Sequence, residues 1–221
     1  MTAQDAIGKS ATEPSDATVI AEVLAGDRGR FAVLVQRYNQ PAFRVCRAVL
    51  RNDADAEDAL QTAWLKAYRA LASFRADASF RTWMTRIAIN EATSRLRQQR
   101  KLTAIPVEEM TMTPSDSPEQ EVFTKELARM LEHEIDELPD GLRSVLVLRD
   151  VIELDTAETA ECLQIGEENV RVRLHRARAA LADRLSGSLV STDALPEVWR
   201  FAGERCARVL AHVMAGIEES P

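Results

Sequence analysis

The chain has 221 residues, enough for one large domain or two small ones. Glycine and proline number only 8 each, which argues against a turn-rich sandwich or barrel, and 46% hydrophobic residues exclude wholesale disorder. No apolar run reaches the length of a membrane helix, and the three widely spaced cysteines form no CxxC pair of the kind that a zinc site uses. We therefore expect a mostly helical protein of the cytoplasm, with no metal, no cofactor and no membrane insertion.

The net charge of −7 is unevenly distributed along the chain. Residues 26–101 carry 15 Lys and Arg against 7 Asp and Glu, a local charge of +8, whereas residues 102–126 and 127–185 each have a charge of −5. A concentrated basic segment in an acidic chain can bind phosphate locally without binding nucleic acid everywhere. A solvated Arg-rich helix on an ordinary globular protein explains the same charges, so charge alone leaves both interpretations open.

Residues 1–17 are polar and show no pattern, and we expect them to form a disordered tail. After this tail, the apolar side chains recur with a helical period. The clearest helices are expected over 31–50, 52–71 and 80–101, each with an apolar stripe on one side. Region 18–101 is therefore predicted to form a compact bundle of four helices.

Residues 102–126 hold three prolines and six acids without a sustained period, so we predict a flexible acidic linker. A second helical domain follows over 127–185. Its first helix is expected to bury Leu127, Met130, Leu131, Ile135 and Leu138. Residues 186–221 are predicted to be a C-terminal extension with one amphipathic helix that starts near Pro196. The predicted fold class is all-α: two small helical domains joined by a linker, the second a helix-turn-helix, plus a C-terminal helix.

Residues 156–180 show a short helix, a turn over 163–166 and a second helix. At about 100° per residue, one side of the second helix is apolar and must face a core. The apolar positions are Val170, Leu174, Ala177 and Leu181, and the opposite side carries Arg171, Val172, His175 and Arg176. A basic face on an exposed helix is what a recognition helix in a DNA major groove requires. A solvated Arg face on a bundle helix remains the alternative.

The helix from Phe80 carries a broad basic sector opposite its apolar side. This sector includes an asparagine able to contact a base edge, and aromatic residues lie at its border and in the loop before it. The residues concerned are Phe74, Trp83, Arg86, Asn90, Arg97, Arg100 and Lys101. Cations beside aromatic rings are typical of surfaces that bind unstacked bases of a single strand. For Trp83, simple burial in the core is the competing interpretation.

An acidic run at 53–58 needs a separate explanation. An EF-hand loop is excluded, because glycine is missing from its sixth position and glutamate from its twelfth. Asp53 and Asp55 are explained by the positive end of a helix dipole. Glu57, Asp58 and Gln61 lie off the apolar stripe, and we expect that they can meet a basic helix of a partner.

Two blocks of the sequence resemble a known family. DAEDALQTAWLKAYRAL (55–71), followed by SFRTWMTRIAINEATSRLR (79–97), resembles the second conserved region of bacterial RNA polymerase sigma factors. ELPDGLRSVLVLRDV (137–151), with ENVRVRLHRARAAL (169–182), resembles their fourth region. The third region is missing, and this is typical of the extracytoplasmic-function (ECF) group. The resemblance implies a transcription initiation factor that is not an enzyme.

The resemblance also implies partners and site residues. Glu57, Asp58 and Gln61 would bind the β′ clamp of core RNA polymerase, and the β flap of the polymerase is a further expected partner. Phe74, Trp83, Arg86, Asn90, Arg97, Arg100 and Lys101 would open and capture the minus-ten element of promoter DNA. The minus-thirty-five element would be read by Arg171, Val172, Arg173, His175, Arg176 and Arg178. Some members of the family are bound by an anti-sigma factor, which is therefore a further expected partner.

The sequence departs from the family at several positions. Thr62 stands where an acid is usual, and Ser94 stands where Asp is common. Residues 166–168 (Gly-Glu-Glu) replace the usual start of the recognition helix and bring two carboxylates close to DNA phosphates. An autonomous helix-turn-helix regulator, which dimerises on palindromic duplex DNA, is the alternative function. That alternative leaves the basic helix with Asn90 and the acidic run unexplained.

Overall fold

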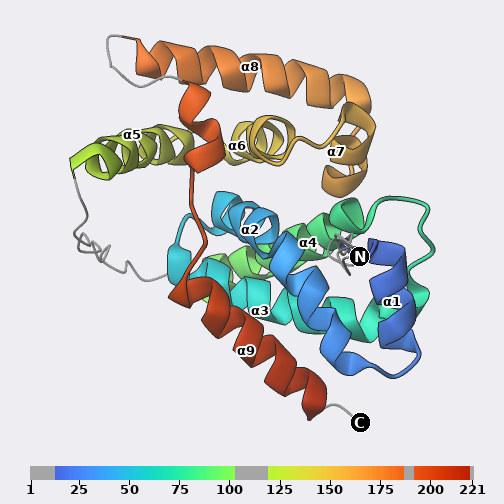
Figure 1. The fold of residues 1–221 in the computed structure, drawn as a ribbon. Coiled ribbons are helices and arrows are strands. Elements are labelled where there is room, and N and C mark those ends of the chain that lie inside the picture. The colour runs from blue at the N-terminus through green and yellow to red at the C-terminus, as the bar shows by residue number, and fades with distance from the viewer. Residues whose placement is uncertain (1–12, 103–118, 187–191, 220–221) are drawn as a thin grey trace, which may run out of the picture.

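The computed structural model describes residues 13–102, 119–186 and 192–219, and within these ranges every regular element is a helix (Figure 1). We call these three ranges the first domain, the second domain and the C-terminal segment. The predicted all-α fold, with two helical domains and a further C-terminal helix, is confirmed. None of the helices in the described ranges has both the length and the apolar character that crossing a bilayer requires.

The first domain consists of α1 (Asp16–Leu24), α2 (Phe31–Leu50), α3 (Asp53–Ala70) and α4 (Phe80–Leu102), with short 3-10 turns η1 (Arg28–Arg30) and η2 (Leu71–Ser73). Helices α2, α3 and α4 pack against one another around the fully buried ring of Trp64. Trp64 Nε1 donates a hydrogen bond to Asn39 Oδ1 at 3.0 Å, so its polar atom is satisfied inside the core. This is the four-helix bundle that the apolar stripes predict.

The start of α1 differs from the expected tail over 1–17. Ser15 Oγ accepts a backbone N–H of the first turn at 3.2 Å, and this cap lets the helix begin at Asp16. Arg37 from α2 donates to Asp16 at 2.8 Å and so binds the first turn of α1 to the bundle. The prediction for residues 1–12 lies outside the described residues.

The second domain consists of α5 (Glu119–Asp136), α6 (Asp140–Leu146), the π-helical turn η3 (Val147–Val151), α7 (Thr156–Leu163) and α8 (Glu167–Leu185). Helices α6 and α7 pack under α8, which runs along the top of the molecule in Figure 1. Asp155 begins α7 through a reciprocal capping box with Glu158. Gln164, with a φ of 54°, ends α7 in the left-handed region and turns the chain toward α8. The predicted helix-turn-helix arrangement is present.

Two details of α5 differ from the prediction. The helix begins at Glu119, eight residues before the expected start, because Glu, Gln and Lys favour helix without producing an apolar period. The predicted linker residues 103–118 lie outside the described residues. Met130 is 51% exposed rather than buried. The buried side of α5 is formed by Ala128, Leu131 and Ile135, and Leu138 is buried just after the helix ends. Met130 lies on the opposite side of this helix.

The second domain rests directly on the first, with α7 on α4 and α6 on α2. Arg143 of α6 is almost fully buried between them. Its guanidinium donates to the carbonyl oxygens of Leu138 at 2.6 Å and of Ala48, in α2, at 2.6 Å. It also pairs with Asp140 at 2.7 Å. The bonds to Leu138 and Asp140 lie within the second domain, and the bond to Ala48 crosses to the first. Because all three satisfy the buried guanidinium, Arg143 fixes the position of α6 on the first domain.

The C-terminal segment returns from the second domain to the first, and its helix lies beside α3 (Figure 1). It contains η4 (Thr192–Glu197) and α9 (Glu204–Glu218). The sequence predicts this helix from near Pro196, but it begins only after Gly203. The intervening residues Trp199 and Phe201 are 4% and 2% exposed, because they insert between the two domains and against Phe43 instead of continuing a helical stripe.

Candidate nucleic-acid interface

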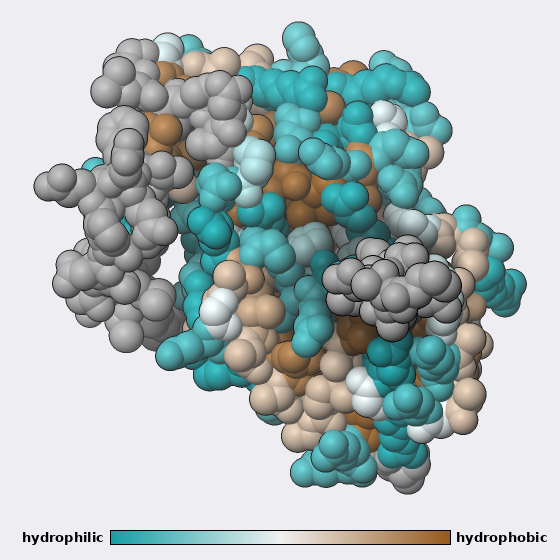
Figure 2. Space-filling model, viewed as in Figure 1, coloured by the Kyte–Doolittle hydropathy of each residue, from teal (hydrophilic) through white to brown (hydrophobic). Residues whose placement is uncertain are grey.

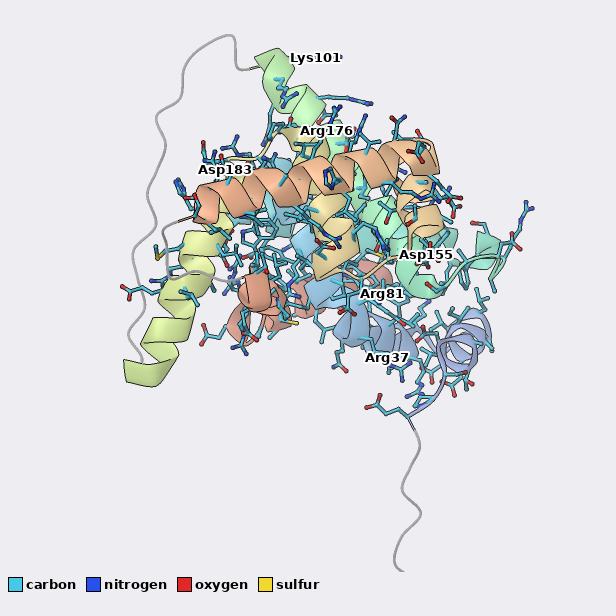
Figure 3. The ribbon with its side chains drawn as sticks, turned by 90° about the horizontal axis from the view of Figure 1, so that it is seen from above. Arg37, Arg81, Lys101, Asp155, Arg176 and Asp183 are labelled. Carbon is cyan, nitrogen blue, oxygen red and sulfur yellow. The ribbon has the colours of Figure 1, made fainter. Side chains whose placement is uncertain are left out.

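Helix α8 separates its side chains as the sequence predicts. Val170, Leu174, Ala177 and Leu181 are buried, and Arg171, Val172, His175 and Arg176 are exposed. Arg176 lies near the middle of this helix in the view from above (Figure 3). The space-filling view shows hydrophilic side chains over much of the same helix (Figure 2). The helix therefore offers a convex, basic surface of a size that enters a major groove.

The two carboxylates at the start of α8 hold one cation of this surface. Arg171 pairs with Glu167 at 2.9 Å and with Glu168 at 3.3 Å. Both acids also lie in the first turn, where the helix dipole favours negative charge. The Arg171 guanidinium is therefore paired with carboxylates of its own helix.

Two further predicted contacts on α8 are directed to neighbouring elements, although the Arg178 side chain is itself exposed. Arg178 forms a two-point ion pair with Asp150 at 2.9 and 2.6 Å, and this hydrogen bonding raises the pKa of Arg178 above its usual value. Arg173 is half-buried and lines a groove of about 250 Å³ between α8 and the first domain. Across this groove lie Arg97 and Arg100 of α4. Of the six predicted residues of α8, Arg173 is half-buried and the other five are exposed, with Arg178 held by Asp150.

The second basic surface follows α4. Asn90, Arg97, Arg100 and Lys101 are exposed, and Lys101 lies at the end of α4 that extends past α8 (Figure 3). Arg86 is half-buried. The structure thus places the predicted cations and Asn90 along a single helix, with the last turns of that helix open to solvent.

The aromatic residues beside α4 form one cluster with the core. Trp83 is half-buried, and its ring centroid lies 5.2 Å from that of Phe74 and 5.5 Å from that of Phe80. Phe80 is buried, but Phe74 and Trp83 each keep part of their surface in solvent. Trp83 therefore lies at the border between core and surface. One part of its ring packs in the core, and the other part stays exposed beside the basic side chains of α4.

Acids of the second domain contact this basic helix. Arg86 pairs with Glu161 of α7, and Arg100 pairs with Asp140 of α6 at 2.7 Å. Thr82 donates to Glu158 at 2.5 Å. Sequence reasoning missed these contacts, although the opposite charges of the two domains were a signal for them. In this arrangement the second domain covers part of the basic surface of α4.

The acidic residues of α3 point to two sides. Asp58 is largely exposed and pairs with Arg95 at 3.2 Å. The Glu57 side chain is only 17% exposed, and it pairs with Arg205 at 2.6 Å and with Arg208 at 3.5 Å. Gln61 is half-buried on the same side of α3. No pattern in the sequence indicates that α9 supplies the basic partner of Glu57.

Family profiles match both domains. The profile described as Sigma-70 region 2 matches residues 34–102, and that described as Sigma-70, region 4 matches residues 128–181. The second match ends before the C-terminal segment. The first match therefore includes α4, and the second includes α8 up to residue 181. The two regions follow in the order that the resemblance implied.

Solved structures share the fold. The structure of CnrH in complex with the cytosolic domain of CnrY matches with a TM-score of 0.57 and 26% identity, over 78% of this chain and 98% of that chain. The sigma factor RpoE of Bartonella quintana, in complex with the anti-sigma factor NepR, matches with a TM-score of 0.54 and 20% identity, over 73% of this chain and 98% of that chain. At that identity, the second match shows the fold alone.

Relatives of known function share most of the chain. The ECF RNA polymerase sigma factor SigM of Mycobacterium tuberculosis is 36% identical over 177 residues, which cover 80% of this chain and 87% of that protein. The ECF RNA polymerase sigma factor SigW of Bacillus subtilis is 34% identical over 176 residues, which cover 75% of this chain and 94% of that protein. The chain belongs to the ECF sigma factors, which are non-enzymatic factors for transcription initiation by RNA polymerase.

Proposed function

We propose that three helices carry the contacts of this sigma factor with its partners. Helix α3 binds the β′ clamp of core polymerase through Glu57, Asp58 and Gln61. Helix α4 captures the separated strand of the minus-ten element, and α8 reads the minus-thirty-five duplex while the second domain contacts the β flap. The observation that supports this most directly is the presence of two basic surfaces of different character, on two different domains.

The surface of α8 suits a paired duplex. The Arg176 side chain is exposed, so its guanidinium can form two hydrogen bonds with a guanine edge. His175 and Val172 lie beside it on the same side and supply a polar and an apolar contact. Arg171 can exchange its bonds to Glu167 and Glu168 for a phosphate. We assign Arg173 and Arg178 to the flank of this interface, since both side chains are directed to neighbouring elements.

The surface of α4 suits a separated strand. The partly exposed rings of Phe74 and Trp83 can stack with unpaired bases, and each stacked base contributes roughly 1–3 kcal/mol. The Asn90 amide offers both a donor and an acceptor to a base edge. Arg97 and Lys101 follow along the helix, where phosphates of the same strand would pass.

Promoter binding requires the two domains to separate. Arg86 and Arg100 are paired with carboxylates of the second domain in the structure described here. DNA phosphates can bind these cations only after Glu161 and Asp140 have moved away. We propose that core polymerase holds the domains apart, at the spacing of the two promoter elements.

The location and a further partner follow from the same proposal. Bacterial RNA polymerase works in the cytoplasm, so we place the protein there. CnrH, which shares the fold at 26% identity, has been solved with the cytosolic domain of a second protein, CnrY. By analogy, we propose that an anti-sigma factor is a further partner of this chain.

Run-off transcription with purified core polymerase tests the function. The template is a pool of upstream DNA fragments from the genome that encodes the protein, and the transcripts are sequenced at their 5′ ends. We expect the full chain to direct starts at fragments that share two short elements at a fixed spacing. If core polymerase starts nowhere, but the chain alone shifts duplex DNA in a gel, the autonomous helix-turn-helix regulator is the better description.

A further inference from the structure

The C-terminal segment lies on the same side of α3 as Glu57. Helix α9 packs against α3 and α2 and buries Val209, Val213 and Ile217 completely. These three residues recur every four positions, so they form one apolar side of α9. The Sigma-70 region 4 match ends at residue 181, and α9 therefore lies outside both matched regions.

Ion pairs join α9 to the acids of α3. The Arg205 guanidinium lies 2.6 Å from Glu57 Oε1 and 3.0 Å from Asp53 Oδ2, and Arg208 lies 3.5 Å from Glu57 Oε2. Arg205 also lies over the ring of Phe43, 5.0 Å from its centroid. Because two guanidinium groups converge on Glu57, this carboxylate is already bound to cations within the chain.

The contact continues along α3 toward its C-terminal end. A Cβ at Gly216 would lie only 2.9 Å from Leu65 Cδ2, so α9 approaches α3 closely because residue 216 has no side chain. Glu57, Gln61 and Leu65 are spaced four residues apart and share one side of α3. Since α9 contacts the first and the last of these residues, it also flanks Gln61, which is half-buried.

The residues before α9 form a separate anchor. Phe201 stacks on Phe43 with ring centroids 4.2 Å apart, and Gln40 Nε2 donates to the carbonyl of Trp199 at 3.0 Å. The backbone N–H of Trp199 also donates to Glu132 of α5 at 2.6 Å. The anchor therefore contacts both domains, whereas α9 packs mainly on α3 and α2 of the first domain. These anchoring contacts are made by residues that precede α9.

We propose that α9 is a built-in competitor of core polymerase for the acidic side of α3. Arg205 and Arg208 take the place of the basic polymerase helix that Glu57 and Gln61 would otherwise bind. Polymerase binds this side of α3 only in the fraction of molecules from which α9 has moved away, so docking of α9 lowers the apparent affinity. This inference rests on the proposed function of Glu57 and Gln61.

A charge reversal in the full chain tests the competition. In the Arg205→Glu/Arg208→Glu variant, α9 is repelled by Asp53 and Glu57, while every residue of α3 is unchanged. We expect fluorescently labelled protein to bind core polymerase about five-fold more tightly than wild type. The matched control is Arg129→Glu/Arg200→Glu, which makes the same change in net charge at two exposed positions outside α9. The control should bind as wild type does.

A reversible cross-link provides the opposite test. Leu65 Cγ lies 3.8 Å from the Cβ position of residue 216, so Leu65→Cys and Gly216→Cys bring two thiols together. Cys206, which is half-buried in α9, is replaced by Ser in this variant. We expect the oxidised protein to bind core polymerase at least about ten-fold more weakly than the same protein after reduction.

The outcomes distinguish this inference from the proposed binding of polymerase by α3, on which it rests. If the charge reversal binds as wild type does, and oxidation of the cross-linked variant leaves its affinity unchanged, α9 is not a competitor, although the protein still binds polymerase. If the helical content of the reversed variant is lost in circular dichroism, the comparison of oxidised and reduced protein decides alone. If neither the wild type, nor the reversed variant, nor the reduced variant binds, the assignment of α3 to polymerase fails and the inference fails with it.

Discussion

Arg47 of α2 and Asp136 of α5 form a two-point ion pair, with distances of 2.9 Å from Nη1 to Oδ1 and 2.7 Å from Nη2 to Oδ2. The same guanidinium donates through Nε to Asp53 at 2.7 Å and lies 5.2 Å from the ring centroid of Trp199. Both members of the pair are at least 85% shielded from solvent. The Arg47 side chain thus contacts the first domain, the second domain and the C-terminal segment, and it lies where these three parts meet.

Loss of Arg47 alone should destabilise the protein strongly. In the Arg47→Leu variant, Asp136 stays largely buried without its partner, and we expect the free energy of unfolding to fall by about 2–3 kcal/mol. Urea denaturation, followed by circular dichroism, measures this loss. The double variant Arg47→Leu/Asp136→Leu removes both charges and should recover much of the stability. Additive losses in the double variant would contradict the coupling of the two residues.

Two arginines of α8 should differ in their effect on promoter binding. We expect Arg176→Ala to weaken binding of the holoenzyme to its minus-thirty-five element by roughly 1–3 kcal/mol, because an exposed guanidinium loses a base contact. Arg178→Ala should cost less, because Arg178 is already paired with Asp150. Filter binding on matched and mutated elements measures both effects. Equal losses for the two variants would contradict the assignment of the outward face as the reading surface.

Asn90 should act after the duplex has been bound. If its amide holds an unpaired base, Asn90→Ala leaves closed-complex formation intact and lowers the yield of open complex. Permanganate footprinting of unpaired thymines measures strand opening, and gel shift at low temperature measures closed-complex binding. Gln98→Ala, at another exposed polar position of α4, is the control. Wild-type footprints for Asn90→Ala would rule out the proposed role.

The sequence predicts the helices and their faces because both depend on local spacing. The burial of Val170 and Leu174 in α8 follows from a helical period that a single helix contains. The association of the domains has no such local signal. Arg143 donates to the carbonyl of Ala48, which lies 95 positions earlier in the chain, and no pattern near either residue indicates that contact.

The C-terminal segment shows the same limit of sequence reasoning. Trp199 fits an apolar helical stripe that ends at Ile217, yet it lies outside α9 and has a φ of 48°. Its burial against Arg47 and near α5 outweighs the local preference for helix, because a tertiary contact of a large ring contributes more than helix propensity. The partners of Glu57 were missed for a related reason: Arg205 lies 148 positions away in sequence.

Glu132 should make the anchor of the C-terminal segment sensitive to pH. Burial raises the pKa of Glu132 above its ordinary value of 4.5. Between that value and the raised pKa, the folded protein keeps a proton that the unfolded chain has lost, so stability decreases as pH rises through this window. Glu132→Gln keeps an oxygen for the backbone N–H of Trp199 but carries no charge. We expect this variant to melt at a higher temperature than wild type at pH 7 and to lose the pH-dependent decrease in stability above pH 4.5.

Glu126→Gln, at an exposed position of α5, is the control and should follow wild type at every pH. Thermal melts of the three proteins across the acid range give the answer, and parallel curves for Glu132→Gln and wild type would exclude a buried charge at this position.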